Sequence, residues 1–218
     1  MGRLFKPIDR AVWKREDYFN HYFHEVPCSY SMTVNLDVTQ LKRTLKAEGL
    51  SFAAAMIYLL TRQVNRHEEF RTAMDAEGQL GVFDALHPSY AVFHEETETF
   101  STLWTTYHAD FRVFHENYHS DMLRYGEREG LVPQPDMPDN VFNISNIPWT
   151  SFTGFNLNLP KGATYLLPIF TLGRYFCQGE QTLLPLAVQV HHAVCDGFHA
   201  CRFINELQET ADHFERLL

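Results

Sequence analysis

A histidine pair near the carboxyl end of the chain has the residue types and spacing for proton-transfer chemistry. His191 and His192 precede Asp196 and Gly197 in the run HHAVCDG. A neutral imidazole can accept a proton near pH 7, so either histidine is a candidate general base. Taken singly, however, a histidine at the end of a strand is more often a hydrogen-bonded core residue, and an aspartate before a helix is more often a cap.

The residues around this pair predict how the two rings are held. In the segment LLPLAVQVHH, period-two alternation predicts a strand whose even positions, ending at His192, form an apolar row. Gln189 and His191 occupy the opposite face. Partial desolvation on the apolar face favours the neutral imidazole that a general base requires, so His192 is the better candidate. Asp196 stands where the cap of a final helix belongs, and Gly197 permits the turn into it.

A second motif has a different chemistry. His115, Glu116 and His119 spell HExxH on a predicted helix, where two histidines one turn apart can bind zinc and the glutamate can activate water. Glu127 or Glu129 could supply a third ligand. The flanking residues HSDMLRYGEREG are polar and indicate a solvated helix face, and short patterns arise readily by chance in a chain with 12 histidines. We therefore interpret this motif as accidental and expect no metal.

The elements that position these residues mix helices and strands without strict β-α-β alternation. Helices are predicted over 12–26, 39–48, 52–64, 110–129 and 196–218, with Thr39 and Ser51 as caps and Gly49 as a stop. Strands are predicted over 28–38, 70–74, 79–83, 90–107 and 141–146, and two more within 165–194 are joined by the turn CQGEQ. This order predicts an α+β fold, a two-layer sandwich in which helices cover a large mixed β-sheet, in one domain spanning residues 1–218.

The composition narrows the function classes. The net charge is −9 with histidine neutral, and no basic stripe is present, which argues against binding nucleic acid. No apolar run is long enough to span a membrane, and the first residues lack the apolar core of a signal peptide. The four cysteines show no CxxC spacing and are expected to be reduced thiols in the cytoplasm. Aromatic residues make up 14% of the chain, which suits either a well-filled core or a pocket for a flat apolar ligand.

Motifs along nearly the whole chain resemble those of one enzyme family. The run VQVHHAVCDGFH is accompanied, in family order, by WKRE, PCSYS, AAAMIYLL, ETETFS, VFNISNIPW, GFNLNL, PIFTLGRY and RFINELQ. The HxxxDG pattern alone occurs in several CoA-dependent acyltransferase families, but the full set is similar to the trimeric chloramphenicol acetyltransferases. The resemblance implies an antibiotic-resistance enzyme that moves the acetyl group of acetyl-CoA directly to the primary hydroxyl of chloramphenicol. It also implies a homotrimer with active sites between subunits.

The same resemblance assigns roles at the site. His192 is the general base, Ser145 donates a hydrogen bond to the oxyanion of the tetrahedral intermediate, and Thr171 assists through a bound water. Asp196 pairs with Arg15 and holds the active-site backbone, so its expected role is structural and it relays no proton.

Two binding regions are implied as well. The drug pocket has an aromatic and apolar lining, which suits a nitrophenyl ring. Its members are Tyr22, Cys28, Phe100, Phe155 and Leu157. Trp149, Arg174 and Tyr175 are expected to contact coenzyme A. Many relatives have lysine where this chain has Ser51, so one cation for the phosphates of coenzyme A is missing here.

Two other functions remain alternatives. The catalytic domain of dihydrolipoyl acyltransferases also uses an HxxxDG histidine, but those chains normally carry lipoyl domains and flexible linkers, which are not evident in these 218 residues. A non-enzymatic binder of chloramphenicol or coenzyme A would not need His192, Ser145 and Thr171 together. Thiol release from acetyl-CoA, measured with and without chloramphenicol, distinguishes these functions.

Overall fold

The computed structural model describes residues 5–158 and 164–218. The helical elements are α1 (Glu16–Asn20), the π-helical turn η1 (His21–Glu25), α2 (Thr39–Glu48), α3 (Phe52–Arg66), η2 (Glu68–Phe70), α4 (Phe111–Tyr125), α5 (Gly197–Asp212) and η3 (Phe214–Leu217). The strands are β1 (Phe5–Pro7), β2 (Ser29–Asp37), β3 (Thr72–Met74), β4 (Leu80–Phe83), β5 (His87–His94), β6 (Thr99–Trp104), β7 (Val141–Ile147), β8 (Ile169–Gly173), β9 (Phe176–Gln178) and β10 (Gln181–His191). None of the described helices combines the length and the apolarity needed to cross a membrane.

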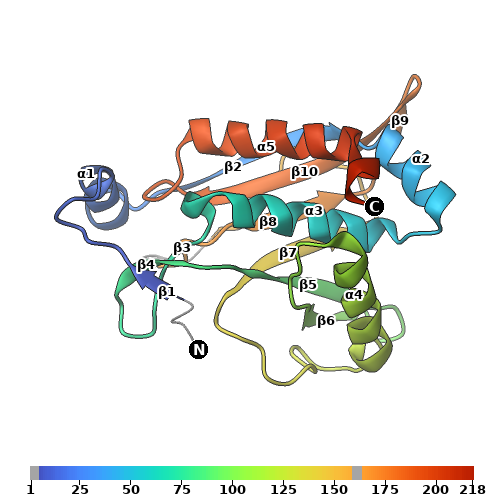
Figure 1. Ribbon diagram of the computed structural model, residues 1–218, viewed down its shortest axis with the longest axis horizontal. Coiled ribbons are helices and arrows are strands. Elements are labelled where there is room, and N and C mark those ends of the chain that lie inside the picture. Colours follow the sequence, from blue (N-terminus) through green and yellow to red (C-terminus); the bar gives the residue numbers. More distant parts are fainter. Residues whose placement is uncertain (1–4, 159–163) are drawn as a thin grey trace.

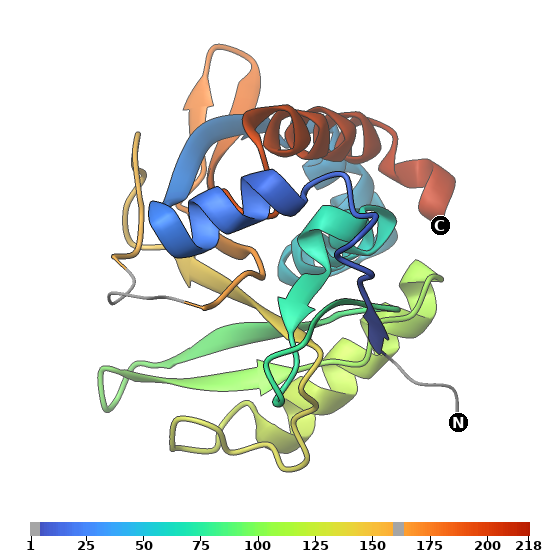
Figure 2. The same cartoon turned by 90° about the vertical axis from the view of Figure 1, so that its left-hand side faces the viewer.

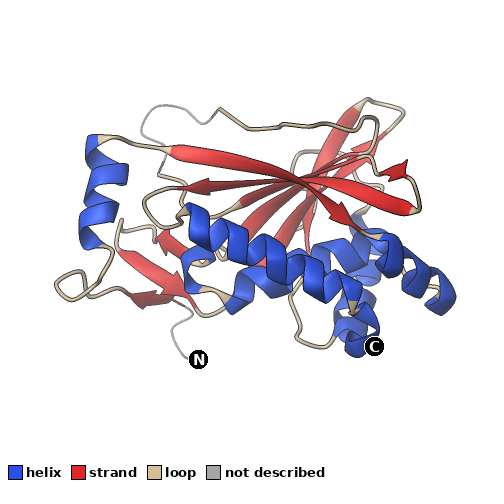
Figure 3. Cartoon of the chain, turned by 90° about the horizontal axis from the view of Figure 1, so that it is seen from above, coloured by secondary structure: helices blue, strands red, loops and turns tan. Residues whose placement is uncertain are grey.

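One large mixed sheet carries most of the candidate residues. Its strand order is β2-β10-β8-β7-β5-β6, and β9 forms a short hairpin with β10. Strand β7 runs parallel to both of its neighbours, whereas the other pairs are antiparallel. Helices α3, α4 and α5 cover one face of this sheet (Figure 1), and the view from above separates the two layers (Figure 3). The prediction of a two-layer α+β fold is confirmed.

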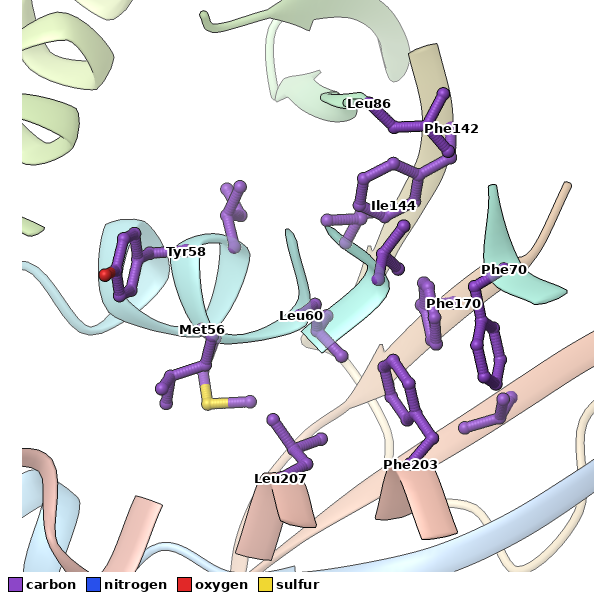
Figure 4. Packing of buried hydrophobic residues seen from close by; sticks show 14 of the residues in the cluster. Met56, Tyr58, Leu60, Phe70, Leu86, Phe142, Ile144, Phe170, Phe203 and Leu207 are labelled. Atoms are coloured by element: carbon purple, nitrogen blue, oxygen red, sulfur yellow. The ribbon is translucent and has the colours of Figure 1, made fainter. Parts of the chain in front are cut away.

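The core lies between this sheet and its helices. Helix α3 is apolar on nearly all sides and is buried along most of its length. Phe170 of β8 stacks on Phe203 of α5 with ring centroids 5.1 Å apart, and Phe142 of β7 packs edge-on against Phe170 (Figure 4). Interlocked aromatic packing of this kind resists deformation, so the strands provide a rigid platform for the residues at their ends.

The amino-terminal elements close one end of the molecule. Strand β1 pairs with β4 in a separate three-stranded sheet of order β1-β4-β3. The segment of α1 and η1 then lies beside the turn between β10 and α5 (Figure 2), where Arg15 meets Asp196. Residues 181 positions apart in the sequence therefore meet at one place.

Local signals explain several helix boundaries. Ser51 caps α3 as predicted, because its hydroxyl accepts the Ala54 N–H at 3.3 Å. Gly49 follows α2 with a φ of 65°, a left-handed conformation that glycine adopts without strain. The prediction of Thr39 as the cap of α2 is wrong. Thr39 is the first helical residue, and the carboxylate of Asp37 accepts its N–H at 2.9 Å.

Other boundaries also differ from the sequence prediction; α4, for example, ends at Tyr125, four residues earlier than predicted. The first regular helix begins at Glu16, four residues later than predicted, after a series of turns. The stretch 90–107 is a hairpin of β5 and β6, and Glu98 in its turn has a φ of 51°. The region 165–194 contains three strands, because β9 pairs with β10 beyond the end of β8.

The predicted placement of His192 within the last strand also needs correction. Strand β10 ends at His191, so His192 lies in the turn that follows it. His191 is only 3% exposed, whereas the side chain of His192 is 29% exposed. Helices cover one face of β10, and the loop around Leu157 covers the other through hydrogen bonds to Gln189. Because both faces are buried, period-two alternation cannot identify the more exposed histidine.

Candidate active site

The ring of His192 is held between the amino-terminal segment and the turn before α5. It stacks on Tyr22 with centroids 3.9 Å apart and an angle of 8° between the planes, and Tyr30 approaches edge-on at 5.4 Å. The main-chain N–H of His192 donates to the carbonyl oxygen of Cys28 at 2.9 Å. Its Nδ1 is buried 3.3 Å from Asp196 Oδ1, without hydrogen-bond geometry to any described atom. Nδ1 is therefore the buried nitrogen, whereas Nε2 has no hydrogen-bond partner among the described residues and the side chain is 29% exposed.

An ion pair supports the turn that carries His192. Arg15 donates from Nη1 to Asp196 Oδ2 at 2.7 Å and from Nη2 to Oδ1 at 3.0 Å, and Nη2 also lies 3.5 Å from the carbonyl oxygen of His192. The hydrogen bonds from Arg15 hold the pKa of Asp196 below its ordinary value, and the same bonds raise the pKa of Arg15. A bidentate pair of this kind fixes the carboxylate in one orientation.

Two further residues at this turn were missed by sequence reasoning. The main-chain N–H of Asp196 donates to His199 Nδ1 at 3.0 Å, and burial lowers the pKa of His199, which keeps that nitrogen an acceptor. The hydroxyl of Tyr30 donates to the carbonyl oxygen of Cys195 at 3.3 Å. The three-residue spacing of Asp196 and His199 is that of a capping box, so this signal was available in the sequence.

Breaking the ion pair is expected to lower stability as well as activity. Asp196→Ala and Arg15→Ala should each cost about 1–3 kcal/mol, below the cost for a fully buried pair because both side chains keep some contact with solvent. For a chain of this length that is roughly 3–10 °C in melting temperature. The double variant should cost much less than the sum of the single variants, because the second removal leaves no stranded charge.

The ion pair also predicts a pH dependence of unfolding. The folded pKa of Asp196 is lowered from 3.8, so its stabilisation is present above about pH 4 and is lost as the pH falls through the lower folded value. Melting curves from pH 3 to 7 should show this acid loss in wild type, and Asp196→Asn should show less of it. An Asp196→Ala variant that melted like wild type and lost only kcat would instead make Asp196 a direct partner of His192.

Ser145 and Thr171 lie together on the sheet face opposite the helices. They are register partners on the parallel strands β7 and β8, and Thr171 is also paired with Ala187 of β10. Ser145 is half-buried and Thr171 is 2% exposed. Within the described part of the chain, neither hydroxyl has a hydrogen-bond partner. Both donors are therefore available to a group bound on this face.

One chain does not bring Ser145 to His192. Ala187 lies two strands from Ser145 in register, and His192 follows Ala187 by five residues. At about 3.3 Å per residue along a strand and about 4.8 Å between strands, the separation is about 16 Å along the sheet and about 10 Å across it. A single reacting group cannot touch both side chains of one chain.

The residues predicted for the drug pocket fall into separate groups. Tyr22 and Cys28 contact His192, as described above. Phe155 and Leu157 belong to the loop that crosses β2 and β10, where the Phe155 N–H donates to Thr33 Oγ1 at 3.3 Å. Phe100 lies elsewhere, on the edge strand β6, and is 53% exposed.

An exposed aromatic patch surrounds Phe100. It consists of Phe93, Phe100 and Trp149, which are 42%, 53% and 56% exposed. Phe93 and Phe100 are register partners, and the rings of Phe93 and Trp149 meet edge to face at 4.6 Å. This patch joins a residue predicted for the drug pocket to one predicted for coenzyme A. Clustered exposed aromatic side chains of this kind typically mark a surface that binds a ligand or another protein.

A cavity of about 540 Å³ lies between α3, α4 and strands β5, β7 and β8. Its inner wall is apolar and includes Met56, Ile57 and Tyr90, which are 1%, 6% and 3% exposed. Its outer wall includes the exposed Arg174 and Tyr175, two of the three residues predicted for coenzyme A. The cavity can therefore hold an elongated ligand with an apolar arm and an anionic end.

The histidines of the HExxH motif are engaged in the fold. His115 Nε2 accepts the main-chain N–H of Ser51 at 3.2 Å, which links α4 to the start of α3. His119 Nε2 lies 3.2 Å from His115 Nε2. Burial, together with nearby His119, lowers the pKa of His115. Among the described residues, no three histidine, cysteine or acidic side chains are grouped so as to hold a metal. A nitrogen that accepts an N–H hydrogen bond cannot also coordinate zinc.

Removal of either motif histidine is expected to leave catalysis nearly intact. His115→Ala and His119→Ala should change kcat less than a few-fold, and chelators should not inhibit. His115→Ala should cost about 1 kcal/mol of stability, because the Ser51 N–H loses its acceptor. Glu116→Gln is the matched control, because a zinc hydrolase would lose its activity with this change. Stoichiometric zinc in protein purified from metal-free buffer would contradict the interpretation.

Comparison with known sequences identifies close relatives. The family model described as "Chloramphenicol acetyltransferase" matches residues 3–208. A protein of that name from Clostridium perfringens is 53% identical over 206 residues, which are 94% of this chain and 98% of that protein. Another from Campylobacter coli is 54% identical over 205 residues, 94% of this chain and 97% of that protein.

Comparison with solved structures identifies the same fold in more distant proteins. A chloramphenicol acetyltransferase aligns with a TM-score of 0.84 at 22% identity, covering 94% of this chain and 98% of that chain. A dihydrolipoamide acetyltransferase of Azotobacter vinelandii aligns with a TM-score of 0.64 at 16% identity, covering 87% of this chain and 84% of that chain. Both likenesses show that this chain shares the fold of these two acetyltransferases.

Proposed function

The chain belongs to the chloramphenicol acetyltransferase family, and from that premise we propose that it transfers the acetyl group of acetyl-CoA to the primary hydroxyl of chloramphenicol and so confers resistance. The observation that carries the proposal is the packing of His192. Its ring lies flat on Tyr22, and its buried Nδ1 faces the pair of Asp196 and Arg15. Nε2 is therefore the nitrogen free to act as general base.

Proton transfer and acyl transfer are coupled in the proposed reaction. His192 Nε2 accepts the hydroxyl proton as the hydroxyl oxygen attacks the thioester carbonyl carbon. The tetrahedral intermediate then collapses with cleavage of the carbon–sulfur bond, and the imidazolium returns its proton to the thiolate of coenzyme A. No acetyl-enzyme forms, so the positioning of both substrates supplies much of the rate.

The oxyanion donor is proposed to come from a second copy of the chain. Ser145, supported by Thr171, would donate to the oxyanion formed beside His192 of the partner subunit. The distance between Ser145 and His192 within one chain supports this arrangement, and so does the exposed patch around Phe100, which a partner would bury. A homotrimer with three shared active sites is the assembly we propose.

Acetyl-CoA is proposed to occupy the cavity between α3, α4 and the sheet. The pantetheine arm would follow its apolar wall, and the nucleotide would lie at Arg174 and Tyr175. Trp149, which follows the lining residue Pro148 in the chain, would lie at the approach to the cavity. The chemistry of this donor set suits an anionic nucleotide, because a cation and an aromatic face are adjacent in the chain. We propose the cytoplasm as the compartment because the sequence predicts that the cysteines are reduced thiols.

Thiol release from acetyl-CoA is the experiment that tests this function. Release should depend on chloramphenicol, and mass spectrometry with fragmentation should place one acetyl group on the primary hydroxyl. An analogue in which fluorine replaces that hydroxyl should support no release. Release with dihydrolipoamide and none with chloramphenicol would favour the dihydrolipoyl acyltransferase reaction instead.

A further inference from the structure

A lysine outside the cavity has no role in the function described so far. Lys42 of α2 places its Nζ 3.4 Å from the ring centroid of Tyr175, and Phe52 of α3 meets the same ring edge to face, with centroids 6.2 Å apart. Lys42 is half-buried and forms no ion pair with a carboxylate in the described part of the chain. A cation held on an aromatic face without an acidic partner is available to an anionic ligand.

The position of Lys42 relative to the cavity indicates which part of a ligand it reaches. Arg174 and Tyr175 belong to the cavity lining, whereas Lys42 does not and contacts the ring of Tyr175. The ammonium of Lys42 therefore lies outside the lining to which Arg174 belongs. Ser51 adds no charge, because a serine hydroxyl is neutral, and that hydroxyl accepts the Ala54 N–H at the start of α3.

The overall charge of the chain makes this cation significant. There are 27 acidic residues and 18 lysines and arginines, so long-range attraction of an anion is unfavourable. Binding of a polyanionic nucleotide must depend on local cations. Lys42 on the ring of Tyr175, and Arg174 next to Tyr175 in the cavity lining, are two such cations.

We propose that Lys42 binds the 3′-phosphate of coenzyme A and so makes the enzyme selective for the 3′-phosphorylated nucleotide. This inference rests on the proposed use of acetyl-CoA. The pyrophosphate is bonded directly to the pantetheine arm, which suits Arg174 of the lining, whereas the 3′-phosphate is carried on the ribose beyond it, which suits Lys42 outside the lining. Stacking on Tyr175 holds the ammonium in place before the ligand arrives, which limits the side-chain entropy lost on binding.

Calorimetric titration with coenzyme A and with 3′-dephospho-coenzyme A tests the proposal. Lys42→Gln should weaken the binding of coenzyme A by about 5- to 10-fold, a typical loss for one charge-assisted contact at a partly exposed site. The affinity of the Lys42→Gln variant for 3′-dephospho-coenzyme A should stay within twofold of that of wild type. Lys42→Arg should restore most of the preference for the 3′-phosphate. Arg43→Gln, which removes an exposed cation next along α2, should change neither affinity.

Kinetics give a second measurement on the same variants. Lys42→Gln should raise KM for acetyl-CoA and leave KM for chloramphenicol unchanged. The inference would be overturned if Lys42→Gln weakened the binding of both nucleotides equally, or if it left the affinity for coenzyme A unchanged. Either result would leave the proposed function standing. Failure of wild type to bind coenzyme A at all would overturn both.

Discussion

Replacing His192 with alanine is expected to lower kcat for acetyl transfer by about 10⁴-fold, the upper end of what a positioned general base contributes. The chloramphenicol hydroxyl then has no positioned base to accept its proton as its oxygen attacks the thioester. The melting temperature should change little, because the ring lies on the surface of Tyr22 and is partly exposed. Steady-state kinetics and melting curves on the purified variant provide the measurement.

His191→Ala is the matched control for this experiment. His191 is nearly fully buried, and its Nδ1 accepts the N–H of Ala193 at 3.2 Å. Its removal should therefore lower the melting temperature and reduce kcat far less than His192→Ala does. More than about 1% residual activity in His192→Ala would be too much for loss of the sole general base. Reversed effects of the two substitutions would assign the base to His191.

Ser145→Ala is expected to have the second largest effect, a loss of about 10²- to 10³-fold in kcat. The hydroxyl donates to charge that exists only in the transition state, so KM for each substrate should change little. Ser145 is half-buried and its hydroxyl is free of described partners, so the melting temperature should stay near that of wild type.

Thr171→Val provides the comparison for Ser145→Ala. Thr171 is the register partner of Ser145, and the substitution keeps a β-branched side chain while removing the hydroxyl. Because its proposed contribution passes through a water, the loss in kcat should be smaller. A rise in KM with unchanged kcat for Ser145→Ala would show that the hydroxyl binds substrate and transition state equally, which contradicts the oxyanion role.

Much of the fold was predictable because local signals agreed with the tertiary structure. The run FAAAMIYLL after Ser51 combines a cap with a nearly continuous apolar surface, and α3 is the buried helix that this pattern predicts. Gly49 ended α2 for a similarly local reason. The loop turn at Glu98 was missed because a glutamate with positive φ carries no sequence signal, so β5 and β6 were merged.

The site was predictable only in part, because its contacts are long-range. The pairing of Arg15 with Asp196 spans 181 positions and came from the family resemblance, since no periodicity could give it. The π-helical turn that presents Tyr22 to His192 has no local signature in HYFHE. The contact between Lys42 and Tyr175 joins α2 to the segment after β8 and is visible only in three dimensions.

We propose that His192 of one subunit and Ser145 of another form one active site, and the combination of two inactive variants tests this shared site. Chains carrying His192→Ala and chains carrying Ser145→Ala, each with a different affinity tag, are co-expressed and purified through both tags. In such mixed trimers, about one third of the interfaces unite an intact His192 with an intact Ser145, by the geometry of a closed ring. Acetylation of chloramphenicol should therefore return to about one third of the wild-type rate per trimer. Mixed trimers with only the residual activity of the single variants would contradict the shared active site.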